Sequence, residues 1–216
     1  MIMKQTIANI VGSTLLAGCS VVGVRAGTEE PPYQVLSQIS DDIELRQYGE
    51  RLAAEVSMDS RSPRANENSA FSILAGYIFG DNRTQTKVSM TSPVATNLPS
   101  EKIAMTTPVE TNTQDDGLYT MRFFLPEAYS LDTAPVPNNP QVSLVPVPRQ
   151  IIAAIKFSGW RNQEAVSMHE DVLMRSLNES KWKPTADPVA FFYDPPWTAP
   201  FLRRNEVAVT VALRDK

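Results

Sequence analysis

The apolar residues switch between a period of two and a period of 3.6 in an order that occurs twice along the chain. Ile43–Arg46 alternates like a half-buried strand, and Val142–Val145 resembles it in the second half. Helical patterns follow at Ala70–Phe79 and Gln163–Glu179. Because one such unit buries too small a core to be stable alone, the repeat predicts a single α+β domain of two strand–helix–strand–strand units.

Further strands and a linker complete this plan. Besides the two above, alternation predicts strands at Arg51–Val56, Val88–Val94, Ile103–Thr111, Leu118–Leu125, Ile151–Ile155, Val189–Tyr193 and Glu206–Leu213. The Pro- and Asn-rich segment Leu131–Pro140 separates the halves.

The amino terminus predicts export. Lys4 precedes an apolar stretch, Ile7–Ala17, which is shorter than the roughly 20 apolar residues of a membrane-spanning helix. It ends in Leu16-Ala17-Gly18-Cys19, small residues before a cysteine, as in bacterial lipoprotein signals. We therefore expect residues 1–18 to be a signal peptide, residues 19–32 a flexible tether, and residues 33–216 the domain.

Lipidation of Cys19 would anchor the protein to the membrane, because several acyl chains hold a protein stably where one is marginal. In a cell with two membranes, the residues around Cys19 resemble the signal for the outer one, and we expect its periplasmic face. An ordinary secretory signal with a chance cysteine is the alternative.

Composition excludes several functions. Cys19 is the single cysteine and His169 the single histidine, so neither a disulfide nor a structural zinc site is expected. A formal net charge of −4 argues against nucleic-acid binding. No catalytic triad has a convincing base, and no glycine-rich phosphate loop is present. We therefore expect a binding protein and not an enzyme.

Three motifs indicate a family. Lys87–Val94 contains Met-Thr-Ser-Pro-Val, and Lys102–Val109 contains Met-Thr-Thr-Pro-Val; Tyr193–Val207 begins Tyr-Asp-Pro-Pro-Trp and ends Arg-Arg-Asn-Glu-Val. Together they resemble the SOUL haem-binding family from about Tyr33 to the C-terminus. The resemblance implies a distorted, mainly antiparallel β-barrel flanked by two helices, with haem or a related tetrapyrrole as ligand.

The resemblance places the tetrapyrrole against the first helix. By position, Phe71, Leu74, Tyr77 and Ile78 would contact it. The alternative is that this face packs into the core, as amphipathic helices normally do.

Arg203 and Arg204 are candidates for holding a propionate, because guanidinium binds carboxylate in a forked geometry. The alternative is an ion pair with Asp194 or Glu206.

Other motif residues have simpler interpretations. Met90 and Met105 are expected to fill the core, although one of them could face a ligand or reach a haem iron. Trp197 and Phe201 are expected to pack around the Asp-Pro-Pro turn, and Phe79 is expected to be exposed.

His169 falls within the apolar stripe of the second helix. It is either a partly buried residue with one hydrogen bond or an axial ligand of haem iron. Binding through apolar contacts alone is equally compatible with the resemblance.

The sequence thus predicts a lipid-anchored envelope protein that binds haem or a related tetrapyrrole non-covalently, for carriage, buffering or sensing. Its protein partners are not indicated. A binding module for another hydrophobic small molecule, resembling the gyrase inhibitory protein-like domains, is one alternative. A scaffold without a ligand is the other.

Overall fold

The computed structural model describes residues 29–59, 63–84, 103, 106–113, 118–194 and 197–214. The predicted signal peptide, Cys19, Met90 and Met105 lie outside the described residues, as does the predicted strand Val88–Val94. No helix in the described ranges is both long and apolar enough to cross a membrane.

Twelve strands, two α-helices and one short 3-10 helix make up the described fold. In chain order they are β1 (Tyr33–Ser40), β2 (Ile43–Tyr48), β3 (Arg51–Asp59), α2 (Pro63–Ile78), β4 (Asn82–Arg83), β5 (Val109–Thr113), β6 (Leu118–Phe124), β7 (Val136–Pro137), β8 (Ser143–Val147), β9 (Gln150–Phe157), α3 (Gln163–Asn178), β10 (Trp182–Pro184), β11 (Val189–Phe192), η1 (Pro200–Leu202) and β12 (Asn205–Leu213).

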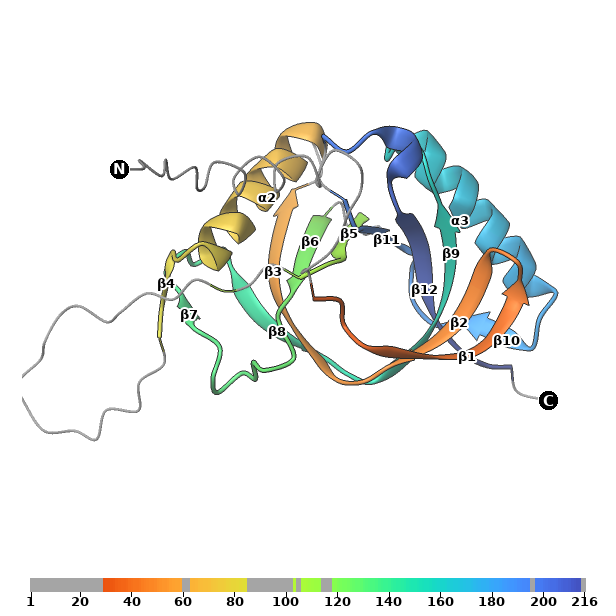
Figure 1. The fold of residues 1–216 in the computed structure, drawn as a ribbon, viewed down its shortest axis with the longest axis horizontal. Coiled ribbons are helices and arrows are strands. Elements are labelled where there is room, and N and C mark those ends of the chain that lie inside the picture. The colour runs from red at the N-terminus through yellow and green to blue at the C-terminus, as the bar shows by residue number, and fades with distance from the viewer. Residues whose placement is uncertain are drawn as a thin grey trace, which may run out of the picture.

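Ten strands form one antiparallel sheet. Its order is β1-β2-β9-β12-β11-β5-β6-β3-β8, with β10 paired to β12. The sheet curls into a half-barrel with α2 and α3 on its outer side (Figure 1). The two halves meet where β11 pairs with β5. The predicted α+β class with a distorted antiparallel barrel and two flanking helices is confirmed, while the pseudo-two-fold symmetry stays a prediction.

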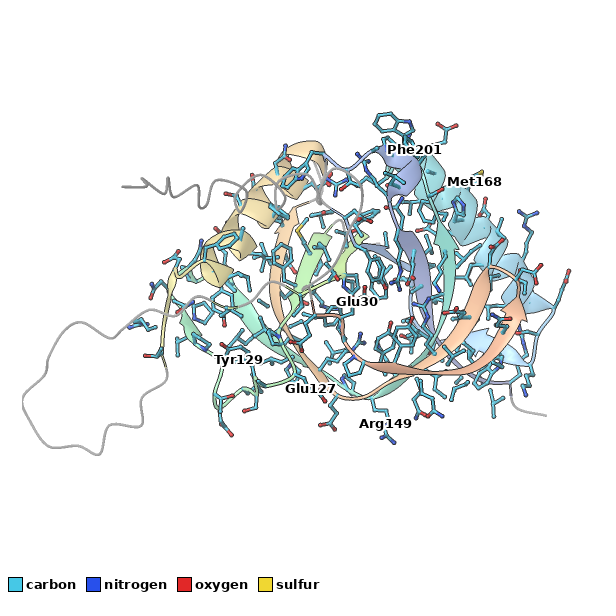
Figure 2. All side chains as sticks on the ribbon, viewed as in Figure 1. Glu30, Glu127, Tyr129, Arg149, Met168 and Phe201 are labelled. Atoms are coloured by element: carbon cyan, nitrogen blue, oxygen red, sulfur yellow. The ribbon has the colours of Figure 1, made fainter. Side chains whose placement is uncertain are left out.

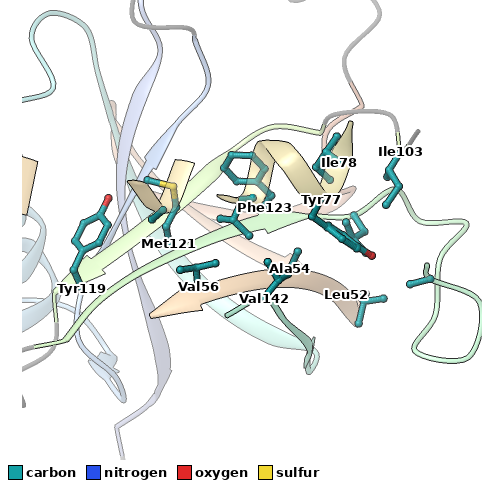
Figure 3. Close-up of a cluster of buried hydrophobic side chains, with 14 residues drawn as sticks. Leu52, Ala54, Val56, Tyr77, Ile78, Ile103, Tyr119, Met121, Phe123 and Val142 are labelled. Atoms are coloured by element: carbon teal, nitrogen blue, oxygen red, sulfur yellow. The ribbon is translucent and has the colours of Figure 1, made fainter. Parts of the chain in front are cut away.

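Each helix covers its own apolar core. Beneath α2, Tyr77 and Ile78 belong to one apolar cluster with Met121 and Phe123 of β6 (Figure 3). Beneath α3, Leu173 and Leu177 pack against strands β2, β9 and β12. Fully burying one such side chain contributes roughly 1.5–3 kcal/mol, so these layers hold the sheet in its curled shape.

The opposite side of the sheet, which we call the concave face, faces away from both helices. Side chains alternate along each strand, so every second residue of β2, β3, β6, β9 and β12 points there. A third apolar cluster lies on this face and includes Tyr48, Phe124, Ile152 and Phe191. Buried charged residues, among them Arg46 and Glu206, lie beside this cluster.

Some predicted boundaries need correction. Helix α3 ends at Asn178, one residue before the prediction, but α2 begins at Pro63 and not at Ala70. Proline is favoured at the first helical position, and the polar residues after it hide the helical period. Strand β5 begins at Val109, directly after Pro108, which has no N–H to donate to a ladder.

The end of the predicted tether lies against the domain. The backbone N–H of Thr107 donates to the carbonyl oxygen of Glu29 at 3.0 Å, and the N–H of Glu127 donates to the Glu29 carboxylate at 2.9 Å. Glu30 lies within the half-barrel in Figure 2. Residues 29 and 30 are therefore part of the folded unit.

Candidate functional site

A buried ion pair on the concave face links β2 to β12 across the intervening strand β9. Arg46 of β2 and Glu206 of β12 form two hydrogen bonds, at 2.6 and 3.1 Å, and both side chains are fully buried. The Arg46 Nε also donates to Glu44 at 2.8 Å. A buried charge is tolerated only when it is paired and hydrogen-bonded. Loss of either residue of this pair would therefore destabilise the fold.

Two residues of the C-terminal motif complete this network. The Tyr193 hydroxyl donates to Glu206 at 2.8 Å, and the Arg204 Nε donates to the same carboxylate at 2.9 Å. The Arg204 guanidinium lies 3.8 Å from the Tyr193 ring centroid and also contacts Glu30 at 3.1 Å. Glu206 is thus surrounded by three donors.

Burial sets the pKa values of this network. Burial opposes the charge of Arg46, but hydrogen bonds and charge attraction from Glu206 outweigh it, so the pKa of Arg46 is raised. Burial raises the pKa of Tyr48 to about 12. Burial also raises the pKa of Tyr193 well above its usual value, and the charge of Glu206 adds to the shift. At neutral pH the arginine is charged and both tyrosines are neutral.

A second ion cluster lies on β3, β5 and β6. Arg122 donates to Glu55 at 2.5 Å and to Glu110 at 2.7 Å. Glu110 is almost completely buried, and burial raises the pKa of its carboxyl group although Arg122 acts in the opposite direction. The positive charge of Arg122 therefore stabilises the buried carboxylate of Glu110.

A cavity of about 310 Å³ opens on the concave face between the two halves. Its apolar lining residues include Val147, Ile152, Val189, Phe191 and Ala208. Its polar lining includes Glu110, Arg122, Gln150 and Asp187. Apolar walls with a few fixed polar groups are typical of small-molecule sites, whose volumes are usually about 300–1,000 Å³.

Arg51, the first residue of β3, lies beside this cavity. Its guanidinium stacks on Tyr48 at 4.3 Å and on Phe124 at 4.5 Å from the ring centroids. Arg51 lies opposite Val147 in the β3–β8 register, so the two side chains share a face of the sheet. Aromatic rings thus hold a cation near the cavity.

The predicted ligand-contact residues of α2 lie mostly in the core. Leu74, Tyr77 and Ile78 are at most 1% exposed. Phe71 is 39% exposed and packs edge-on against Phe123 at 5.4 Å. The alternative, that this face packs into the core, describes three of the four residues. The role of all four in ligand binding stays a prediction, and for Leu74, Tyr77 and Ile78 it would require α2 to move.

Arg203 and Arg204 already have protein partners. The Arg203 Nε donates to the carbonyl oxygen of Thr198 at 2.8 Å, and its guanidinium lies 5.7 Å from the Trp160 ring centroid. Arg204 pairs with Glu206, one of the two alternatives that the sequence suggested. The other alternative, Asp194, accepts a hydrogen bond from the Arg204 backbone N–H at 2.7 Å, and its charge acts on Arg203.

The aromatic residues of the C-terminal motif are more exposed than expected. Trp197 is 66% exposed and Phe201 76% exposed, so the expectation that they pack around the turn is wrong. Phe201 lies in the short helix η1, and Trp160, which follows Gly159, whose N–H donates to the Pro200 carbonyl oxygen at 2.9 Å, is also exposed. Phe79 is exposed, as predicted.

His169 lies on the helix-facing side of the sheet, away from the cavity. Its Nδ1 donates to the Ala165 carbonyl oxygen at 2.6 Å, and its ring stacks on Phe157 at 3.9 Å. This matches a partly buried residue with one hydrogen bond. Among the described residues, no group of three or more His, Cys, Asp or Glu could hold a metal ion. Axial ligation by His169 stays a prediction.

Sequence analysis missed the residues that shape this site. Arg46, Arg51, Glu110 and Arg122 each stand at a polar position of an alternating strand, where a solvent-facing side chain is the usual expectation. The available signal was an excess of charges in otherwise apolar strands. The sequence does not show that the sheet curls, and it is this curling that buries the side chains on its concave face.

The geometry defines a class of protein: an antiparallel half-barrel with outer helices and a small, partly apolar cavity on its concave side. The family model described as "SOUL heme-binding protein" matches residues 28–210. The chain therefore belongs to the SOUL heme-binding family. Among curated protein sequences, none matches this chain.

Solved structures share the fold at low sequence identity. The EcmrR C-terminal domain is 11% identical with a TM-score of 0.56, over 84% of this chain and 99% of that one. An uncharacterized conserved protein from Listeria innocua is 13% identical with a TM-score of 0.54, over 79% of this chain and 92% of that one. At these identities the likeness concerns the fold alone.

Proposed function

We propose that the protein binds haem or a related tetrapyrrole non-covalently, at the cavity of the concave face. The observation that carries this proposal is membership of the SOUL heme-binding family over residues 28–210. The cavity supports it, because Val147, Ile152 and Phe191 offer an apolar surface to a macrocycle. Its volume of about 310 Å³ is small for a ligand site, so it would accept one edge of a tetrapyrrole.

The residues present fit apolar recognition better than iron ligation. The described lining of the cavity contains neither histidine nor methionine. Haem would supply an iron atom when bound. The residues of this chain would bind the macrocycle and its carboxylates. The role that follows is carriage, buffering or sensing, without turnover.

A titration tests this function. The domain starting after Cys19 is titrated with haemin and with iron-free protoporphyrin, followed by absorbance and by quenching of tryptophan fluorescence. Saturable binding of both ligands with similar affinity is expected. Binding of haemin alone with a shifted Soret band would instead implicate iron ligation, which His169→Ala would then test. Binding of neither ligand would reject the function.

The lipid anchor is part of the proposal. Cys19 follows small residues at the end of a short apolar stretch, and acylation there would hold the domain at the envelope, at the periplasmic face of the outer membrane where the cell has two membranes. The measurement is membrane fractionation with mass analysis of the N-terminal peptide. Wild type should be acylated and membrane-bound, and Cys19→Ser should lack acylation. Equal processing of both forms would reject the anchor.

A smaller hydrophobic molecule is the second candidate ligand. The observation that favours it is the volume of the cavity, which is at the low end for ligand sites. Displacement of an apolar fluorescent dye by small hydrophobic compounds, in protein that binds neither porphyrin, would support it. A protein that binds neither porphyrins nor dye would leave the scaffold alternative.

A further inference from the structure

We propose that Arg51 is the anchor for a carboxylate of the ligand, so that the concave cavity receives an anionic amphiphile by its charged edge. This inference rests on the proposed function, since a tetrapyrrole with propionate groups is such a molecule. It assigns the ligand's carboxylate to a residue outside the sequence motifs.

Three observations place Arg51 directly behind the lining residues of the cavity. It lies opposite the lining residue Val147 across the β3–β8 pair. Phe124, which stacks on its guanidinium, packs edge-on against the lining residue Phe191 at 6.4 Å. The charges of the lining residues Glu110 and Arg122 both act on Arg51. A group held in the cavity would therefore be next to this guanidinium.

The guanidinium of Arg51 is buried without hydrogen-bond partners for two of its nitrogen atoms. Within the described part of the chain, neither Nε nor Nη2 has an acceptor, although both atoms are buried. Burial accordingly lowers the pKa of Arg51. A buried donor without an acceptor destabilises the fold, and such a group in a native protein needs an explanation. A ligand carboxylate would supply the missing acceptors once a neighbouring side chain moved aside, because neither atom has accessible surface in the ligand-free structure.

The other arginines of the concave face are already bound to carboxylates. Arg46 is held by Glu206, Arg122 is held by Glu110, and Arg204 is shared between Glu206 and Glu30. An incoming carboxylate would have to displace one of these. At Arg51 it would meet a cation that contacts two aromatic rings and has two donors without an acceptor in the described part of the chain.

The stacking also favours arginine over lysine at this position. Tyr48 and Phe124 contact the guanidinium, which fixes its plane before a ligand arrives. A planar guanidinium binds a carboxylate through two parallel hydrogen bonds, which an ammonium group cannot do. Preorganisation of this kind lowers the entropy lost on binding.

The test uses a diacid and its neutral diester. Full-chain wild type, Arg51→Gln and Arg149→Gln are each titrated with protoporphyrin IX and with its dimethyl ester. Arg149 is exposed and points outward from the turn between β8 and β9 (Figure 2), so it is the matched control. Wild type and Arg149→Gln should prefer the diacid, and Arg51→Gln should lose about 10- to 100-fold in affinity for the diacid alone.

The outcomes separate this inference from the proposed function. Equal affinities of Arg51→Gln and wild type for the diacid would overturn the role of Arg51 and leave tetrapyrrole binding in place. Binding of neither porphyrin by wild type would overturn the proposed function, and the inference with it.

A stability measurement gives an independent readout. Arg51→Met keeps an apolar chain between the rings and removes the buried donors, so the ligand-free variant should have a higher Tm than wild type. A Tm lowered by Arg51→Met would show that the protein itself compensates this guanidinium. That result would also overturn the inference.

Discussion

Arg46 and Arg51 stand on consecutive strands of the same concave face and differ in their surroundings. Arg46 is fully buried and donates to Glu206 and Glu44. The Arg51 guanidinium contacts the Tyr48 and Phe124 rings, and two of its donors have no acceptor among the described residues. Arg46 has its acceptors within the fold, and Arg51 has two donors that no described residue accepts from.

This difference separates structure from function on one surface. A fully satisfied buried network fixes the relative position of the strands that it joins, here β2 and β12. An unsatisfied buried cation lowers stability and persists where it has another use, such as binding. We infer that charge on the concave face has two roles, which variants can distinguish.

The largest effect is expected from Arg46→Met. The substitution leaves the Glu206 carboxylate buried without its main partner, and removing one member of a buried pair costs about 3–5 kcal/mol. The measurement is the free energy of unfolding in urea. Arg149→Met, at an exposed position, is the control. If Arg46→Met unfolded at the same urea concentration as wild type, the structural role of this pair would be refuted.

Next in size is Arg122→Gln, whose effect should depend on pH. Burial raises the pKa of Glu110 and Arg122 lowers it, so loss of Arg122 raises this pKa further. Above the unfolded-state pKa, the folded state then binds more protons than the unfolded state, and stability falls as pH rises. We expect the free energy of unfolding of Arg122→Gln to be about 1–3 kcal/mol below that of wild type at pH 8, and this difference to shrink towards pH 5. A deficit independent of pH would contradict this assignment.

Alkaline pH should weaken the network around Tyr48. Its pKa in the folded protein is about 12, against 10 for an unperturbed tyrosine. Between these values the unfolded state loses the proton and the folded state keeps it, so stability falls by up to about 1.4 kcal/mol per pH unit. Unfolding free energies at pH 9, 10 and 11 measure this slope. Tyr48→Phe should make it less steep, and an unchanged slope would refute the prediction.

The smallest effect is expected from Glu30→Gln. Glu30 and Arg204 form a partly exposed ion pair, and such pairs contribute about 0–1 kcal/mol. The substitution should lower the Tm slightly and speed proteolysis near residue 30. Glu50→Gln, at an exposed position, is the control. A large loss of stability would mean that the N-terminal segment holds the half-barrel together.

Local patterns predicted the helices and most strands, because apolar periodicity depends on neighbours in sequence. The α3 helix was predicted to within one residue, as Val166, Leu173 and Leu177 form a regular buried stripe. The start of α2 was missed because its first half is polar. The family motifs supplied the barrel, which periodicity alone does not define.

The candidate site could not be predicted in the same way. Arg46 and Glu206 are far apart in the sequence, and only the pairing of β2 with β9 and of β9 with β12 brings them together. Arg51 looked like a solvent-facing strand residue, and its lack of acceptors depends on the tertiary structure. Burial of Leu74, Tyr77 and Ile78 likewise depends on which side of α2 the sheet covers.

Hydrogen–deuterium exchange of the full chain with and without protoporphyrin IX tests the central claim most directly, because it locates the ligand. The cavity is lined by Gln150 beside the β8–β9 turn and by Ala186 and Asp187 before β11. We predict slower exchange on binding in these two segments and unchanged exchange in α2. Protection confined to α2 around Phe71 would contradict the concave-face site and favour the outer helix surface.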